Sequence, residues 1–269
     1  MEDVDFIRKE WMCDRNRHPY VGEGKNASDI ACMWEAGSST YSFDRYSGIR
    51  DSIVDRLLET GHLNGTILDI GCGPGTYAIP FSKHAKHVIA TDSSKGMLAR
   101  LKDDCDAFGI SNIETVLCDC TEIPSEYGSD LVFCSLCPPM NSPESLEYMM
   151  SLGKTSAYVS SCSFSDGLEI RIWNALGKDY SYCGYNTDYP YRYLKSSGFD
   201  ATLELFSQKN HSEFTVEQSI ARFESLISRY RNLDDEMRSK IARTVEDDSE
   251  DGIVYTDTTV TMGLLIWSV

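Results

Sequence analysis

Three closely spaced glycines and the acid before them are the residues of this chain best placed to hold a charged ligand. Residues 66–78 read TILDIGCGPGTYA, so the glycines at 71, 73 and 75 follow Asp69. A strand that runs into such a turn presents bare backbone N–H groups, because glycine has no side chain to block a ligand. Asp69 is a poor core residue and needs a partner such as an ammonium group or N–H donors. The segment predicts a ligand site, with a glycine-rich turn that binds nothing as the alternative.

A second acid follows at a spacing that suits a ribose. Asp92 ends the strand-like run 87–91 and stands 21 residues after Gly71. A carboxylate accepts two hydrogen bonds side by side, which matches two ribose hydroxyls. The dinucleotide fingerprint G-x-G-x-x-G would need glycine where this chain has Thr76. An NAD-dependent oxidoreductase is therefore disfavoured, and it stays open as an alternative.

The glycine turn with an acid two residues before it resembles the first motif of the class I S-adenosylmethionine-dependent methyltransferases. The resemblance covers about residues 62–206 and the last strand. It implies S-adenosylmethionine as the cofactor and an in-line transfer of its methyl group to an acceptor. The cofactor-binding residues that we predict on this basis are Tyr41, Arg45, Asp69, Gly71, Cys72, Gly73, Gly75, Thr76, Asp92, Ser93, Met97, Asp119, Cys120, Ser135 and Leu136.

Four of these residues have a more specific expected role. In the resembled enzymes the segment before the first strand closes over the cofactor, so Arg45 is expected to meet the cofactor carboxylate, with a solvated surface arginine as the alternative. Ser93 is expected to cap the next helix, and Met97 to pack near the adenine or simply in the core. Asp119 is expected to accept a hydrogen bond from the adenine amino group, in preference to capping a helix.

The loop after the fourth expected strand reads Cys-Pro-Pro-Met-Asn from Cys137. In the resembled family this loop holds the methyl group against the acceptor. Amino-methylating members have a polar residue before the prolines and an aromatic residue after them, so this departure argues against adenine- or glutamine-type methylation. The residues that we predict on the acceptor side, with a catalytic role, are Cys137, Tyr185, Asp188 and Tyr191.

Six tyrosines lie between residues 180 and 193. Aromatic faces attract cations such as a sulfonium, so the cluster suits a pocket wall, with packing of a loop onto the sheet as the alternative. Tyr189 precedes Pro190 and is expected to be extended.

The chain has 269 residues, 10 cysteines and a net charge of −17. Such a surface repels phosphate backbones, so a nucleic-acid partner is disfavoured and a small-molecule acceptor is expected. No apolar run of roughly 20 residues and no signal peptide are evident, which predicts a cytoplasmic protein without a membrane partner. The oligomeric state stays open.

The cysteines are expected to be mostly reduced. Cys118 and Cys120 form C-x-C, and Cys134 and Cys137 form C-x-x-C, but the pairs do not flank a turn as zinc knuckles do, and no metal site is predicted. Because thiols bind soft metalloids, a thiol or arsenite-type methyltransferase is an alternative.

Strand and helix patterns alternate from Thr66 to Cys162, which predicts an α/β fold with a doubly wound, mostly parallel sheet. The resemblance implies seven strands, of which the last is antiparallel. Three units are expected: an N-terminal helical cap (1–60), a Rossmann-like methyltransferase core (61–206 with 257–269) and a helical insertion or lid (207–256). If the insertion is instead an interaction surface, the chain is a non-catalytic cofactor-binding partner protein.

Overall fold

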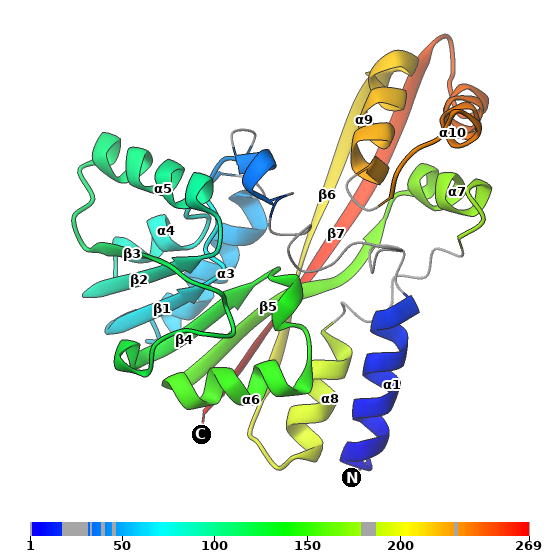
Figure 1. Cartoon of the computed structure of the whole chain (residues 1–269). Coiled ribbons are helices and arrows are strands. Elements are labelled where there is room, and N and C mark those ends of the chain that lie inside the picture. The colour runs from blue at the N-terminus through cyan, green and yellow to red at the C-terminus, as the bar shows by residue number, and fades with distance from the viewer. Residues whose placement is uncertain are drawn as a thin grey trace.

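The computed structural model describes residues 2–17, 32, 34–38, 41–44, 47–178, 187–228 and 231–268. These residues contain a seven-stranded sheet with the order β3-β2-β1-β4-β5-β7-β6 (Figure 1). The strands are β1 (Thr66–Ile70), β2 (His87–Asp92), β3 (Ile113–Leu117), β4 (Ser129–Ser135), β5 (Gly153–Ser165), β6 (Thr202–Thr215) and β7 (Ile253–Ser268). β1 to β5 are parallel, and β7 runs antiparallel between β5 and β6. The predicted fold class is confirmed.

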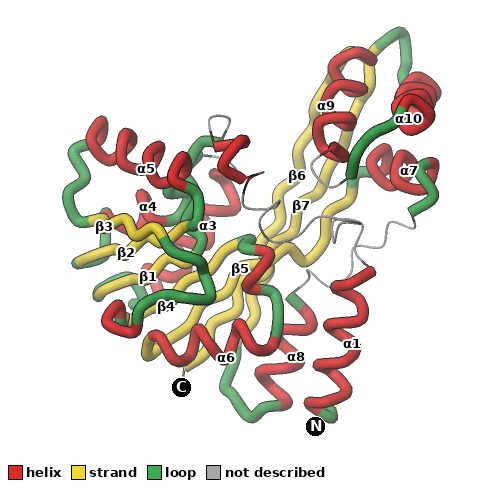
Figure 2. Tube along the Cα trace, in the orientation of Figure 1, coloured by secondary structure: helices red, strands yellow, loops and turns green. Residues whose placement is uncertain are grey.

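Helices cover both faces of the parallel strands (Figure 2). On one face lie α3 (Ser47–Glu59), α4 (Ala78–Ser82) and α5 (Lys95–Phe108). On the other lie α1 (Val4–Arg17), α6 (Pro143–Leu152) and α8 (Asp188–Ser196). Successive strand residues alternate between the two cores, as Ile67 and Leu68 do, because side chains in a strand point to opposite faces.

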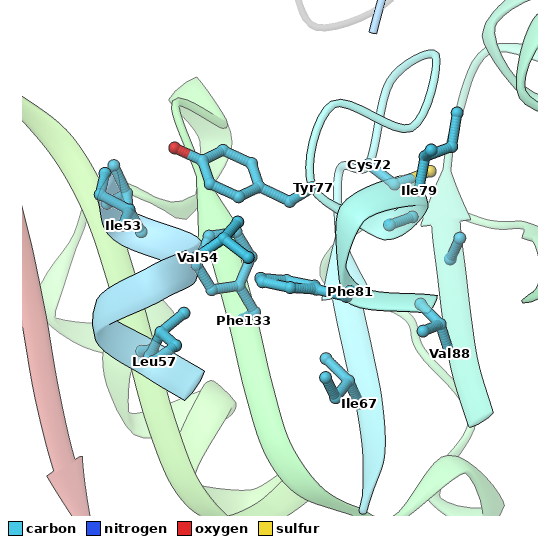
Figure 3. Packing of buried hydrophobic residues seen from close by; sticks show 14 of the residues in the cluster. Ile53, Val54, Leu57, Ile67, Cys72, Tyr77, Ile79, Phe81, Val88 and Phe133 are labelled. Carbon is cyan, nitrogen blue, oxygen red and sulfur yellow. The ribbon is translucent and has the colours of Figure 1, made fainter. Parts of the chain in front are cut away.

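The core on the α3 side supports the glycine turn (Figure 3). Tyr77, which follows the turn, packs 4.6 Å from the ring of Phe133 on β4, and Phe81 meets the same ring edge-on at 4.9 Å between centroids. Ile53 and Leu57 of α3 belong to the same cluster. The turn between β1 and α4 therefore rests on a fully packed aromatic layer.

A separate apolar core lies at the far end of the long strands, where β6 and β7 extend beyond the rest of the sheet (Figure 1). It joins α7 (Gly167–Ala175), α9 (Val216–Ser228) and α10 (Asp235–Asp247) to Val254 of β7. We call this part, residues 166–176 and 207–256, the arm. None of the described helices is long and apolar enough to cross a membrane.

The strands of the arm are longer than the sequence suggested. Pairing continues from Thr202↔Ile266 to Thr215↔Ile253, whereas we expected the sixth strand to stop at Phe206 and the last to start at Thr258. Side chains of β6 alternate between half-buried and exposed, so the hairpin continues as a ribbon that α9 covers. The division of the chain into cap, core and lid stays a prediction.

Tyr189 corrects a second expectation, because it lies in the first turn of α8 and is not extended. Pro190 follows it near the helix start, where a missing N–H donor leaves no intrahelical bond unmade.

Candidate functional site

All three glycines of the turn have left-handed backbone angles, with φ of +67° at Gly71, +55° at Gly73 and +91° at Gly75. A Cβ on Gly71 would stand 2.8 Å from the sulfur of Cys137, and one on Gly75 would stand 2.4 Å from Cδ1 of Leu101. At Gly73 no described atom outside the adjoining residues lies within 4 Å of that position. The turn is thus held by packing at its two ends and is open at its middle glycine.

Asp92 joins this turn to the next helix. Its carboxylate accepts hydrogen bonds from the backbone N–H of Gly73 at 2.9 Å and of Ser94 at 2.8 Å. Burial raises the pKa of Asp92, and the backbone donors oppose that shift. The acid of the second strand and the open glycine, which the sequence placed 19 residues apart, therefore meet.

Asp69 is 2% exposed, at the carboxyl end of β1. Its carboxylate accepts a bond from the backbone N–H of Ala78, but Oδ2 has no hydrogen-bond partner among the described residues. Burial, followed by the charge of nearby Asp92, raises the pKa of Asp69 to about 8. A buried oxygen without a partner is costly, so this position fits a ligand that brings a donor or a positive charge.

The N-terminal segment reaches the same place. Glu35 accepts hydrogen bonds from the backbone N–H of Gly96 at 3.0 Å and from the hydroxyl of Ser94 at 2.6 Å. We call residues 34–38 the strap, because they lie over the start of α5 beside Asp92. Nothing in the sequence pairs Glu35 with a helix 61 residues later, and we did not anticipate this contact.

The helix cap is Ser94, not Ser93 as expected. The Ser94 hydroxyl accepts from the backbone N–H of Met97 at 3.1 Å, whereas Ser93 is exposed. Asp92 is held by the glycine turn, so the chain needs two residues before the helix begins. Met97 is buried, as a residue near the adenine or a plain core methionine would be.

The other predicted cofactor residues lie on loops or strand ends around this turn. Asp119 is exposed, and its Oδ1 accepts from the N–H and hydroxyl of Thr121, which lowers the pKa of Asp119. Ser135 bonds to the hydroxyl of Tyr77, and Leu136 is 43% exposed with a left-handed φ of +48°.

The remaining predicted cofactor residues are described individually. Cys72 is buried and its N–H donates to the carbonyl of Thr91 at 2.9 Å, while Thr76 is half-buried. Tyr41 is half-buried and stands edge-on to Trp34, 5.6 Å between ring centroids. Arg45 lies outside the described residues.

A tryptophan from the N-terminal helix holds the acceptor loop. Trp11 is fully buried and its indole N–H donates to Oδ1 of Asn141, 1% exposed, at 3.0 Å. Asn141 directly follows the short helix η3 (Pro138–Met140). Trp11 also stacks on Tyr189 of α8, with centroids 6.3 Å apart. This anchor was not anticipated, because its two residues are 130 positions apart.

The predicted acceptor-side residues are spread over two surfaces. Cys137 lies against Gly71 of the turn. Tyr191 is half-buried in the α1–α6–α8 core, and the exposed carboxylate of Asp188 stands 3.4 Å from Nη1 of Arg192. Tyr185 lies outside the described residues. A cavity of about 400 Å³ beside Thr66 lies at the opposite, amino-terminal edge of the strands.

Residues 67–153 match a family model described as a methyltransferase domain. This segment is a methyltransferase domain. The predicted family is confirmed for it, and it contains the glycine turn, Asp69, Asp92 and the acceptor loop.

Relatives of the methyltransferase domain differ in what they act on. The chain is 34% identical over 79 residues to a tRNA/tmRNA (uracil-C(5))-methyltransferase of Campylobacter concisus, covering 29% of this chain and 22% of that protein. It is 34% identical over 82 residues to a probable cobalt-precorrin-6B C(15)-methyltransferase of Methanococcus maripaludis, covering 29% and 45%. The chain thus spans less than half of the length of these curated relatives.

Solved structures show the same fold at low identity. A methyltransferase-like protein from Bacillus halodurans has a TM-score of 0.51 at 18% identity, covering 80% of this chain and 98% of that one. DhpI in complex with SAH has a TM-score of 0.50 at 17% identity, covering 66% and 89%.

Proposed function

We propose that this chain is an S-adenosylmethionine-dependent methyltransferase that acts on a small molecule by in-line methyl transfer. The observation that carries the proposal is the unpartnered, buried Oδ2 of Asp69 beside the open face of Gly73. Membership of the methyltransferase domain supports it, and so does a neighbour of the same fold that was solved with SAH.

The donor set fits the two ends of such a cofactor. Asp69 would satisfy its unpaired oxygen with the cofactor's ammonium group, and Asp92 would turn from Gly73 and Ser94 toward the ribose hydroxyls. Gly73 leaves room for the ligand between them. When bound, the cofactor supplies a methyl group on a positively charged sulfonium.

This chain's own contribution is mainly positioning, because an activated methyl group needs an acceptor held in line more than it needs a proton transfer. The Trp11–Asn141 bond fixes the acceptor loop, and Cys137 holds that loop against Gly71. The strap closes the ribose side over Ser94. We assign acceptor-side roles to Cys137 and to the α8 face with Tyr191, and we keep Tyr185 and Asp188 as candidates.

A small-molecule acceptor is proposed from the net charge of −17, which opposes binding of a polyphosphate chain. The relatives include one named for RNA and one named for a cobalt-precorrin, so RNA is the competing acceptor class. All cysteines that the structure describes are free thiols, which supports our proposal of a cytoplasmic location.

Calorimetry with S-adenosylhomocysteine, and with NAD⁺ as the rival ligand, tests the cofactor site. We expect binding of the first only, and a loss of about 10- to 100-fold in affinity for Asp92→Asn, since a hydrogen bond to a charged group contributes about 1.5–3 kcal/mol. Asp130→Asn is the matched control, because this acid pairs with Lys154 away from the turn. Binding of NAD⁺ alone would sink the proposal.

The acceptor class is tested separately. The protein is incubated with methyl-labelled S-adenosylmethionine and either a low-molecular-weight extract or total RNA. We expect label in the small-molecule fraction. Label in the RNA alone would reassign the acceptor, and label in neither fraction, with the cofactor bound, would favour a non-catalytic cofactor-binding protein.

A further inference from the structure

Three thiols come together beside the glycine turn. The Cys137 thiol makes hydrogen bonds with those of Cys120 and Cys134. Cys134 ends the buried part of β4, while Cys120 follows β3, which is separated from β4 in the sheet by β1 and β2. The loops at the carboxyl ends of these strands therefore bring together sulfurs that the sheet order would hold apart.

The cluster lies between the turn and the acceptor loop. The sulfur of Cys137 stands 2.8 Å from the position of a Cβ on Gly71, so it covers the first glycine of the turn. Cys120 and Cys137 are half-buried, whereas Cys134 is fully buried. A ligand would reach the first two thiols before the third.

The surroundings keep these thiols protonated. Contact with Cys137 and burial raise the pKa of Cys120, with Asp119 adding to the effect. The pKa of Cys137 is also raised: its bond to Cys120 favours the thiolate, but contact with Cys134, burial and the charge of Asp92 prevail. A divalent metal needs thiolates, and no described group of three His, Cys, Asp or Glu residues has a geometry that would hold one.

Trivalent arsenic avoids that difficulty. In As(OH)₃ each As–O bond is exchanged for an As–S bond, and the departing hydroxide takes the thiol proton and leaves as water. No oxidant or reductant is needed, no net charge is left in the acidic surroundings, and soft sulfur ligands suit a soft metalloid.

We propose that Cys120, Cys134 and Cys137 form a binding site for trivalent arsenic. Cys120 and Cys137 make the first two bonds, and Cys134 makes the third. Two thiols already in hydrogen-bond contact lose little freedom when one atom bridges them, which is the source of the affinity. Binding does not depend on methyl transfer, so the inference stands or falls separately from the proposed function.

The test uses the full, reduced chain with sodium arsenite and phenylarsine oxide as probes. Calorimetry gives the stoichiometry and affinity, and a thiol-specific reagent counts the thiols that become protected. We expect one arsenite per chain and three protected thiols. Phenylarsine oxide, which can bond to two thiols only, should protect two.

Serine variants assign the sulfurs. Cys120→Ser or Cys137→Ser should lower arsenite affinity about 100-fold, because the chelate becomes a single attachment, and Cys134→Ser about tenfold. Cys105→Ser is the control, since this thiol is buried under α5 away from the cluster. Thermal unfolding of each variant checks the fold, and Cys120→Ala checks against a hydroxyl effect.

An equal loss in Cys105→Ser, or arsenite binding that survives Cys120→Ser/Cys137→Ser in a folded protein, would overturn the assignment. S-adenosylhomocysteine binding of the unmodified chain is measured alongside. If that ligand binds and arsenite does not, the proposed function holds and the thiol site is wrong; the reverse result separates them the other way.

Discussion

The ligand-facing end of the parallel strands and the arm are built on opposite plans. β1 and β4 have five and seven residues, are buried on both faces, and end in Asp69, Gly71 and the acceptor loop. β6 and β7 have 14 and 16 residues, alternate in burial, and end in a small apolar core of their own. Polar groups with unmet bonding capacity can be held in a binding site when packing on two sides fixes them. The arm shows the converse, where a separate core is free to respond by itself.

Ile241→Ala in the arm is the change from which we expect the largest effect. Ile241 is fully buried between α7, α9 and α10, so its truncation should cost about 2–5 kcal/mol of local stability. Because the arm has its own core, hydrogen exchange should rise in residues 216–254 and not in 66–135. Affinity for S-adenosylhomocysteine should stay within about twofold.

Ile53→Ala is the matched control for that experiment, since Ile53 is equally buried but packs beneath the glycine turn. It should raise exchange around β1 and β4 and weaken cofactor binding. If Ile241→Ala weakens binding as much as Ile53→Ala does, the arm and the binding end form one cooperative unit and the contrast fails.

Gly73→Ala compares the two regions at a single atom. Gly73 and Gly252, in the turn before β7, both have left-handed φ angles, and no described atom outside the adjoining residues stands within 4 Å of an added Cβ at either. Both alanines should therefore cost about 1 kcal/mol of stability. Only Gly73→Ala intrudes on the cofactor, and we expect it to lose about 100-fold in affinity, or about 2.7 kcal/mol. Calorimetry and thermal unfolding of the pair measure both effects.

An equal loss of affinity in the two glycine variants would mean that the loss comes from backbone strain and not from the ligand's position.

The same contrast separates what the sequence predicts from what it does not. Strands β1 to β4, the glycine turn and Asp92 follow from local patterns of apolar residues and glycines, and these patterns also placed Met97 and Cys137 near the turn. The contacts of Glu35 and Trp11 could not be found, because they join segments 61 and 130 residues apart and neither residue carries a local signal.

The length of β6 was missed for a different reason. Residues 207–215 are polar and alternate weakly, so they read as a loop until pairing with β7 supplies the missing hydrogen bonds. Pairing between strands that are distant in sequence is a tertiary effect. Local propensity does not record it.

Asp69→Asn tests the buried acid through pH. Because the pKa of Asp69 is raised to about 8, the folded chain holds a proton that the unfolded chain releases above about pH 4. The folded state binds more protons in that window, so stability falls as pH rises from about 4 to 8. An amide cannot ionise, so the variant should match the parent at pH 5 and gain about 2–4 °C in Tm at pH 8.5, equivalent to about 1 kcal/mol.

Asp130→Asn serves as the control of opposite sign. A hydrogen bond from Lys154 lowers the pKa of Asp130, so that carboxylate stabilises the fold when ionised and its loss should not raise the Tm at pH 8.5. A gain for Asp69→Asn that is the same at pH 5 and 8.5 would show that ionisation of this group is not the cause.

Glu35→Gln carries the smallest expected effect and asks whether the strap belongs to the binding end. Hydrogen bonds from Ser94 and Gly96 lower the pKa of Glu35, so the ionised carboxylate makes these contacts at neutral pH and loses them as the pH falls through that lowered pKa. The contact lies at the start of α5, where a negative charge is favourable, and we expect a two- to fivefold loss of S-adenosylhomocysteine affinity, or about that. Glu2→Gln, which removes an equally exposed carboxylate paired with Arg192, should change nothing. If both variants bind alike at pH 7, the strap only decorates the helix, and the binding end is complete without the N-terminal residues.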